Sequence, residues 1–204
     1  MTPPLRVSAQ NAVVARSLLG LPDLPTVVVL GPFDDLSQAE QLAAAFTAVR
    51  RRCNAQFVLL GTGVHRTAII RCAFAQGVRA SVHTLSDSSG GAWSDVVAAA
   101  DLVVLSPDSG PRTLLEILGA GRAVVAPADA ETVRLVVPAS AGLVYRPGDA
   151  SGLAGALLRL LTKPALRHGM ACRAAEVARR HRLRRIRLQQ FDEREQPCIA
   201  SSDE

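Results

Sequence analysis

The sequence predicts an α/β protein with a single doubly wound parallel sheet of about six strands and helices on both faces. Short runs of consecutive apolar, often β-branched residues, such as residues 26–31 and 56–61, recur along the chain and end at glycine or at a polar turn. Runs of this kind are typical of strands that are buried on both faces. Segments with helical spacing separate them, and this regular alternation favours a parallel sheet joined by crossover helices.

Each element has its own signal in the sequence. We expect strands at residues 26–31, 56–61, 80–85, 101–106, 122–126 and 142–145. We expect helices at residues 8–19, 36–52, 64–76, 92–100, 111–118, 131–136, 151–161 and 164 to about 190. Ser8 can cap the first helix and Gly20 stops it, while Pro111 begins a helix that ends at Gly119, the order that helices favour. Residues 87–91 form a polar Ser/Gly loop.

Length and composition limit the classes of protein to consider. The chain has 204 residues, 49% of them apolar and only 3% aromatic. This balance suits one globular domain and excludes disordered, collagen-like and coiled-coil chains. So few aromatic rings speak against a stacking platform for single-stranded nucleic acid. We divide the chain into an N-terminal helix and linker (1–25), a main α/β lobe (26–163), a basic C-terminal helix (164–195) and a flexible tail (196–204).

Positive charge is concentrated in one segment. The net charge is +5, but residues 166–190 hold eight of the 23 basic residues and one of the 18 acidic ones. The rest of the chain is therefore close to neutral. The run from Arg167 to Arg187 is either a solvated helix face or a surface that contacts an anionic membrane or an acidic partner. Nucleic acid ranks behind these because no motif or aromatic residue supports it.

Cysteine spacing predicts neither a metal site nor a disulfide framework. The four cysteines are far apart, none forms a C-x-x-C pair, and we expect buried free thiols in a reducing cytosol. Lone histidines such as His65 and His181 are read as structural residues. No signal peptide and no membrane-spanning run is visible, so we expect a cytoplasmic protein, with the inner face of the membrane as the alternative for peripheral contact.

The segment from residue 106 to 126 carries the chemistry. A strand is followed by Asp108, a Gly-Pro turn and a helix that contains Glu116. Backbone amides at Gly110 to Thr113 can bind an anion, helped by the helix dipole. Two flanking carboxylates can accept hydrogen bonds from hydroxyl groups, which suits a sugar nucleotide. The alternative is that Asp108 only caps the turn and that Glu116 is a solvated helix residue.

The same segment resembles the donor-binding segment of retaining glycosyltransferases of the group-1, or family 4, type. D-S-G-P-R-T-L-L-E-I-L-G-A-G-R-A-V-V-A matches their E-x7-E motif, with Asp108 and Glu116 eight positions apart. Residues 15–22, 57–63, 97–107 and 142–149 resemble other stretches of this family in the same order. The resemblance covers residues 15 to about 180 and implies one Rossmann-like lobe of the two-lobed GT-B fold, the C-terminal lobe that holds the donor.

What the resemblance implies about residues is specific. Glu116 would bind the ribose hydroxyls and Asp108 the donor sugar, the two positions that we assign to catalysis. The turn after residues 80–85 would meet the base. The other donor-binding candidates are Gly31, Gly61, Gly63, Ser109, Gly110, Pro111, Arg112 and Thr113. No cofactor beyond the donor is implied, and the lack of a third glycine after Gly61 and Gly63 argues against NAD.

Departures from the family pattern leave two functions open. The first acid is Asp108 instead of Glu, and Pro111 replaces a glycine. Pro32 and Ser37 stand where the family has cations for the leaving diphosphate, and Arg112 or Arg66 could substitute for them.

The acceptor lobe has no counterpart in these 204 residues. We therefore expect sugar transfer only if a separate acceptor-lobe protein or a homo-oligomer supplies it, with an isolated chain inactive. The alternative is an inactive binding or regulatory module that acts through a protein partner.

Overall fold

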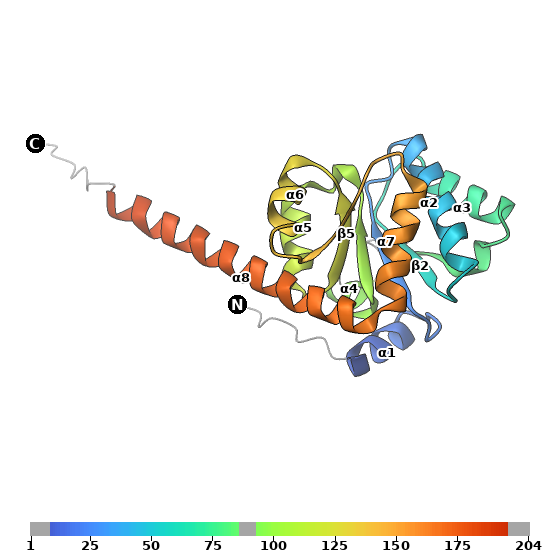
Figure 1. Cartoon of the computed structure of the whole chain (residues 1–204), viewed down its shortest axis with the longest axis horizontal. Coiled ribbons are helices and arrows are strands. Elements are labelled where there is room, and N and C mark those ends of the chain that lie inside the picture. The colour runs from blue at the N-terminus through green and yellow to red at the C-terminus, as the bar shows by residue number, and fades with distance from the viewer. Residues whose placement is uncertain (1–8, 86–92, 196–204) are drawn as a thin grey trace, which may run out of the picture.

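The computed structural model describes residues 9–85 and 93–195, and within them six parallel strands form one sheet in the order β3-β2-β1-β4-β5-β6 (Figure 1). The strands are β1 (Thr26–Leu30), β2 (Gln56–Leu60), β3 (Val82–Leu85), β4 (Leu102–Leu105), β5 (Ala123–Pro127) and β6 (Gly142–Tyr145). The helices are α1 (Ala9–Leu18), α2 (Leu36–Arg50), α3 (Arg66–Ala75), α4 (Trp93–Ala99), α5 (Gly110–Gly119), α6 (Ala130–Val136), α7 (Ala150–Thr162) and α8 (Pro164–Glu195), with 3-10 turns at Arg79–Ser81 and Pro107–Ser109. The predicted doubly wound sheet is confirmed.

Both faces of the sheet are buried, because alternate residues of each strand point to opposite sides. Val27 and Val29 of β1 belong to one apolar cluster, and Val28 and Leu30 belong to the other. Helices α2, α3 and α7 cover the first face, and α4, α5 and part of α8 cover the second. The strands β1, β2, β4 and β5 are buried along their whole length, as their continuous apolar runs predict.

Two elements start two residues later than predicted. Helix α3 begins at Arg66 and not at residue 64, and the two residues before it are held to the loop after β1: the amides of Val64 and His65 donate to Asp34 Oδ1 (3.2 Å) and to the Phe33 carbonyl (2.9 Å). Strand β3 begins at Val82, after a 3-10 turn, and not at residue 80. The predicted polar loop at residues 87–91 lies outside the described residues.

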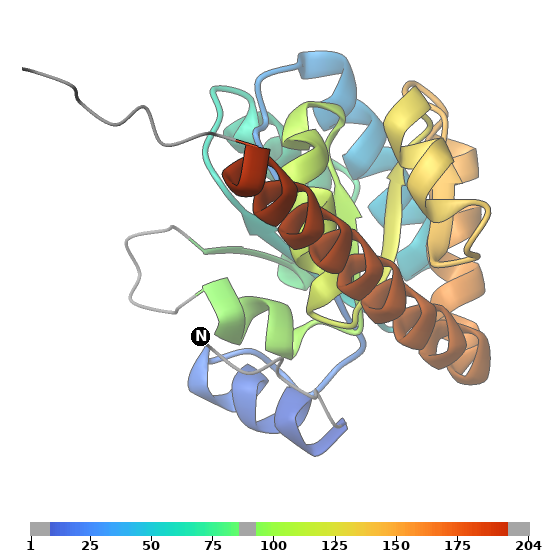
Figure 2. The same ribbon diagram turned by 90° about the vertical axis from the view of Figure 1, so that its left-hand side faces the viewer.

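Helix α8 is the longest element and crosses the second face of the sheet before it extends beyond the body (Figures 1 and 2). Met170, Ala174 and Ala178 recur every four residues and are buried, so they form the contact stripe of α8. Arg167 faces inward: its Nη2 lies 3.2 Å from Asp101 Oδ1, and its Nη1 donates to the Leu160 carbonyl (3.0 Å). The basic surface therefore begins beyond Arg167.

Asp101, just before β4, joins distant parts of the chain at the amino end of the sheet. Its carboxylate lies 2.6 Å from Arg16 Nη2 and accepts from the Thr26 amide at 2.8 Å, in addition to the contact with Arg167. Arg122 also lies in this buried region, where burial lowers its pKa although Asp101 acts to raise it. One carboxylate thus holds α1, the start of β1 and the start of α8 together.

The acid–base behaviour of α8 gives a testable expectation at Glu176. Hydrogen bonds first from Arg179 and then from Arg180 lower the pKa of Glu176 from 4.5 to about 2. A carboxyl whose pKa is depressed on folding stabilises the helix above its unfolded value and loses this contribution as the pH falls. We expect the stabilisation by these pairs to be complete above about pH 4.5 and to be lost towards pH 2.

An NMR titration of the Glu176 carboxyl is the direct measurement. Arg179→Gln removes two of the hydrogen bonds and should move the pKa of Glu176 back towards 4.5. A carboxyl that titrates at its ordinary pKa in the wild-type protein would show that these pairs do not form in solution.

Three further findings concern the cysteines, membrane-spanning helices and metal-binding groups. Cys172 is exposed, and Cys53 and Cys72 are half-buried, so the prediction of buried thiols is wrong for Cys172. Within residues 9–85 and 93–195, no helix has both the length and the apolar character needed to cross a membrane. The same residues contain no group of three or more His, Cys, Asp or Glu side chains that could hold a metal ion.

Candidate functional site

The strand order reverses between β1 and β4, which places the loops that follow these two strands side by side. In open parallel sheets, ligands bind outside the carboxyl ends of the strands at such a reversal. The loop after β1 begins at Gly31, and the turn after β4 contains Asp108. The turn after β2, with Gly61 and Gly63, adjoins the first of these loops.

The loop after β1 packs closely on the turn after β2. The Phe33 amide donates to the Thr62 carbonyl at 3.0 Å, and the Phe33 side chain is buried. Gly63 has φ +144°, and a Cβ built on it would lie 2.5 Å from backbone atoms of Phe33. Glycine at this position is therefore required by the chain itself, because only a residue without a side chain permits this contact.

Two serine hydroxyls tie the turn after β4 to the loop after β1. Ser106 Oγ donates to the Pro32 carbonyl at 2.9 Å, and Ser109 Oγ donates to the Gly31 carbonyl at 3.3 Å. Gly31 and Ser109, both donor-site candidates, are thus brought together by a hydrogen bond. The crevice between β1 and β4 is bridged by the protein's own groups.

A buried polar layer lies beneath this crevice. The Tyr145 hydroxyl donates to the Leu105 carbonyl at 2.9 Å, and burial raises the pKa of Tyr145 above its ordinary value. Both polar atoms of the Gln38 amide are buried, and they have no hydrogen-bond partner that meets normal geometry among the described residues. This layer fixes β6 and β4 relative to each other.

Helix α5 begins directly after the turn that carries Asp108. Gly110 has φ +70°, a left-handed conformation that glycine adopts without strain, and it redirects the chain from the 3-10 turn into α5. Pro111 has no N–H group, so the amides at this helix end that can face an anion are those of Gly110, Arg112 and Thr113. The side chain of Asp108 is exposed at the rim.

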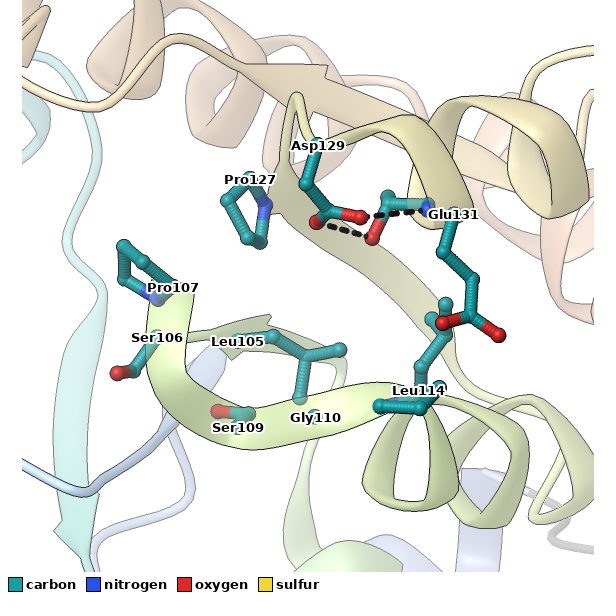
Figure 3. A pocket seen from close by; sticks show the side chains of 11 residues that line it. Leu105, Ser106, Pro107, Ser109, Gly110, Leu114, Pro127, Asp129 and Glu131 are labelled. Carbon is teal, nitrogen blue, oxygen red and sulfur yellow. Dashed lines mark hydrogen bonds between the residues drawn. The ribbon is translucent and has the colours of Figure 1, made fainter.

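A first cavity of about 150 Å³ lies on one side of α5, at the carboxyl ends of β4 and β5 (Figure 3). Ser109, Gly110 and Pro111 form one wall, and Asp129 and Glu131 lie across from them. Asp129 is occupied as the cap of α6: its Oδ1 accepts from the Thr132 amide (2.9 Å) and its Oδ2 from the Thr132 hydroxyl (2.7 Å).

The two carboxylates of this cavity differ in availability. Burial acts to raise the pKa of Asp129, but the hydrogen bonds from Thr132 outweigh it and leave this pKa below the ordinary value. The Glu131 carboxylate has no hydrogen bond or ion pair among the described residues. Glu131 is therefore the carboxylate that can accept a hydroxyl in this cavity.

A second cavity, of about 230 Å³, lies on the other side of α5, between α5 and α8. It is lined by Arg112, Leu115, Glu116, Ala178, His181 and Arg182. Arg112 Nε lies 3.2 Å from Glu116 Oε1, and the side chains are 93% and 51% exposed. An exposed ion pair of this kind is worth about 1 kcal/mol or less, so a ligand can separate it.

The structure brings some predicted residues together and separates others. Asp108 and Glu116 do not line a common cavity. Glu116 lines the cavity between α5 and α8, whereas Asp108 lies on the turn that precedes α5 and lines neither cavity. Arg66, one candidate to replace the missing cations, donates to the Gly61 carbonyl at 3.0 Å.

Sequence reasoning did not find Glu131, His181 and Arg182 as cavity residues. Glu131 followed a predicted strand and could have been noticed as an acid at its carboxyl end. The two residues of α8 carry no local signal, because their position depends on how α8 crosses α5.

Comparisons with known proteins agree with this architecture. The family described as "Glycosyl transferases group 1" matches residues 24–163. Sucrose-phosphate synthase from Thermosynechococcus elongatus is 24% identical, with a TM-score of 0.71 over 89% of this chain and 49% of that one. HepE from Anabaena, solved in complex with UDP and glucose, is 19% identical, with a TM-score of 0.71 over 84% of this chain and 48% of that one.

A third similar structure is a single domain. The C-terminal domain of a glycosyl transferase group 1 family protein (LpcC) from Francisella tularensis is 16% identical, with a TM-score of 0.73 over 83% of this chain and 91% of that one. The chain thus spans about half the length of the two longer structures and most of this domain. Among curated proteins, none matches the sequence.

Proposed function

Because the chain belongs to the group 1 glycosyl transferases, we propose that its lobe binds a nucleotide diphospho-sugar donor across the first turn of α5. The observation that carries this proposal is the pair of cavities that flank the start of α5, with Glu116 in one and Ser109 and Gly110 in the other. Each is smaller than the roughly 300 Å³ of a typical ligand pocket, so one donor would use both. The complex of HepE with UDP and glucose supports this ligand class.

In this arrangement each end of the donor meets suitable groups. The Glu116 carboxylate accepts hydrogen bonds from the two ribose hydroxyls. The diphosphate crosses the start of α5, where the amides of Arg112 and Thr113 and the helix dipole favour an anion. The hexose enters the first cavity, where Ser109 and Glu131 can bind its hydroxyls, and Asp108 contacts the sugar from the rim.

Transfer of the sugar needs more than this lobe. The bond between the anomeric carbon and the phosphate oxygen breaks, a bond to the acceptor oxygen forms, and the nucleoside diphosphate leaves with the proton of the acceptor hydroxyl. A donor site that is open to water on one side neither positions an acceptor nor stabilises the charge that develops in the transition state. We therefore propose that transfer requires a second, acceptor-binding lobe, supplied by a separate protein or by another copy of the chain.

A second candidate is a binding or regulatory module without catalysis, acting through a protein partner. Specific observations favour it: Pro32 and Ser37 provide no cation beside the crevice, and Asp34 and Asp35 add negative charge there. Ser106 and Ser109 also bridge the crevice. Loss of charge-assisted contacts to a leaving diphosphate would slow transfer strongly.

Calorimetry with UDP-, GDP- and ADP-sugars separates these functions. We expect heat from at least one of them and a Kd that rises roughly 10- to 100-fold in Glu116→Gln, because a hydrogen bond to a charged group is worth about 1.5–3 kcal/mol. Glu40→Gln is the matched control: Glu40 is exposed on α2 and has no described partner, so its variant should bind as the wild type does.

Each result has a clear reading. Absence of heat with all three donor classes in the wild-type protein would reject the donor-binding proposal and favour the regulatory module. Equal losses in the two variants would show that net charge, and not the position of Glu116, controls the affinity.

The basic surface of α8 is proposed as an electrostatic contact. Arg167 is used inside the fold, and Arg173 Nε donates to the Ser140 carbonyl at 2.9 Å. The charge available to an anionic membrane or an acidic partner therefore lies beyond these two residues, towards Arg187. Each arginine close to an anionic membrane contributes about 1 kcal/mol.

A further inference from the structure

The cavity between α5 and α8 contains positive charge that the fold leaves uncompensated. Among the described residues, the exposed side chain of Arg182 makes no hydrogen bond and no ion pair, although it lines this cavity beside His181. Its neighbours on α8 differ: Arg179 and Arg180 both pair with Glu176, at 2.9 Å and 2.8 Å. A guanidinium that lines a cavity without a partner there is available to an anionic ligand.

Helix packing places the backbone of Arg182 beside this cavity. The crossing of α5 and α8 is close at Gly119, where an added Cβ would lie 3.6 Å from the Ala178 Cβ. Ala178 is buried, and Arg182 follows it by four residues, one turn further along α8 on the same side. The contact that docks α8 therefore also places Arg182 beside the cavity that Arg112 and Glu116, one turn apart on α5, line from the other helix.

We propose that Arg182 of α8 binds the diphosphate of the donor and that α8 is therefore part of the donor site. This inference rests on the proposed function and adds a residue outside the α/β lobe to the binding site. Arg112 and Arg182 provide two positive charges for the two negative charges of a nucleotide diphospho-sugar. Glu116 releases Arg112 from their ion pair when it turns to the ribose hydroxyls.

The charge distribution around the crevice explains why α8 is needed. The loop after β1 contributes Asp34 and Asp35 and no cation, and Arg66 is engaged by the Gly61 carbonyl. A diphosphate at the start of α5 therefore finds its cations on α5 and α8. Guanidinium groups suit this role because they bind phosphate oxygens through two parallel hydrogen bonds.

The experiment compares three arginine variants by calorimetry. The probes are UDP, GDP and ADP, together with UMP, GMP and AMP. For the diphosphate that the wild type binds, we expect the Kd to rise about tenfold in Arg182→Gln. The rise should be smaller for the matching monophosphate, which lacks the second phosphate group. Arg182→Lys keeps the charge but not the paired hydrogen bonds, so it should recover only part of the affinity.

Arg180→Gln is the matched control. It removes the same charge from the same helix, but Arg180 does not line this cavity. We expect its diphosphate Kd to stay within twofold of the wild-type value. Thermal midpoints of all variants verify the fold, and since Arg182 has no described partner its variants should melt with the wild type.

The possible failures can be told apart. Equal losses of affinity in Arg182→Gln and Arg180→Gln would show that the net charge of α8, and not the position of Arg182, controls binding. That result would overturn the inference. An unchanged Kd in Arg182→Gln, with normal binding by the wild type, would overturn it and leave the proposed function intact. A wild-type protein that binds none of the six nucleotides would overturn both.

Discussion

Replacing Asp101 by asparagine is expected to lower the free energy of unfolding by about 3 kcal/mol, the usual cost of removing one partner from a buried ion pair. Asn keeps the size of the side chain, so the loss reports the charge. The carboxylate is 20% exposed, and Arg16, its partner at 2.6 Å, is 8% exposed. For a chain of 204 residues this loss corresponds to a drop in Tm of roughly 10 °C.

The size of this effect follows from the number of cations around one acid. Arg16 and Arg167 both pair with Asp101, and Arg122 lies close enough for Asp101 to act on its pKa. Without Asp101, these three guanidinium groups repel one another in a region that water reaches poorly. Among the described residues, the only other acid in contact with these arginines is Asp23, which lies 2.8 Å from Arg16 Nη1 and is 64% exposed.

Urea unfolding of Asp101→Asn against Asp23→Asn tests this account. The control removes a negative charge from the same arginine, but at the surface, so it should cost less than about 1 kcal/mol. If both variants lose the same small amount, the buried network contributes no more than a surface ion pair and the explanation fails.

Replacing Gly63 by alanine is expected to destabilise the protein by a similar amount, about 3 kcal/mol. Two costs combine: a side chain at φ +144° is strained, and its Cβ would lie 2.5 Å from the backbone of Phe33. The chain can relieve the overlap only by moving the loop after β1, which would break the hydrogen bond from the Phe33 amide to the Thr62 carbonyl.

Gly77→Ala separates strain from overlap. Gly77 also has positive φ, at +74°, but nothing lies within 4 Å of an added Cβ. Its variant should lose only about 1–2 kcal/mol, the cost of the left-handed conformation. Equal losses in urea unfolding would mean that the packing of Phe33 on Gly63 adds nothing to stability.

Local patterns predicted the fold because this sheet is buried on both faces. The strands β1, β2, β4 and β5 are buried at every position, and apart from Thr26 and Gln56 at the starts of β1 and β2 their residues are apolar, which is distinctive in a single sequence. The boundary of α3 was less predictable. The two residues before it are bound by Phe33 and Asp34, about thirty residues earlier in the sequence, and the local pattern does not contain that contact.

The candidate site was predictable only where its residues lie on one continuous segment. The spacing of Asp108 and Glu116 marks the turn after β4 and the first turns of α5, and the structure places them there. The division into two cavities depends on α6 and α8, which pack on opposite sides of α5. No pattern within residues 106–126 contains that information, and therefore the position of Arg182 could not be predicted.

The start of α5 also sets a length requirement for any ligand that occupies both cavities. Pro111 and Arg112 are consecutive residues, yet the first lines one cavity and the second lines the other. A ligand that fills both cavities must have two bulky ends joined by a thin connection that passes over this turn of helix. The helix thus sets a minimum length for the connection within the ligand. Molecules whose two halves are joined by a shorter connection can occupy one cavity but not both.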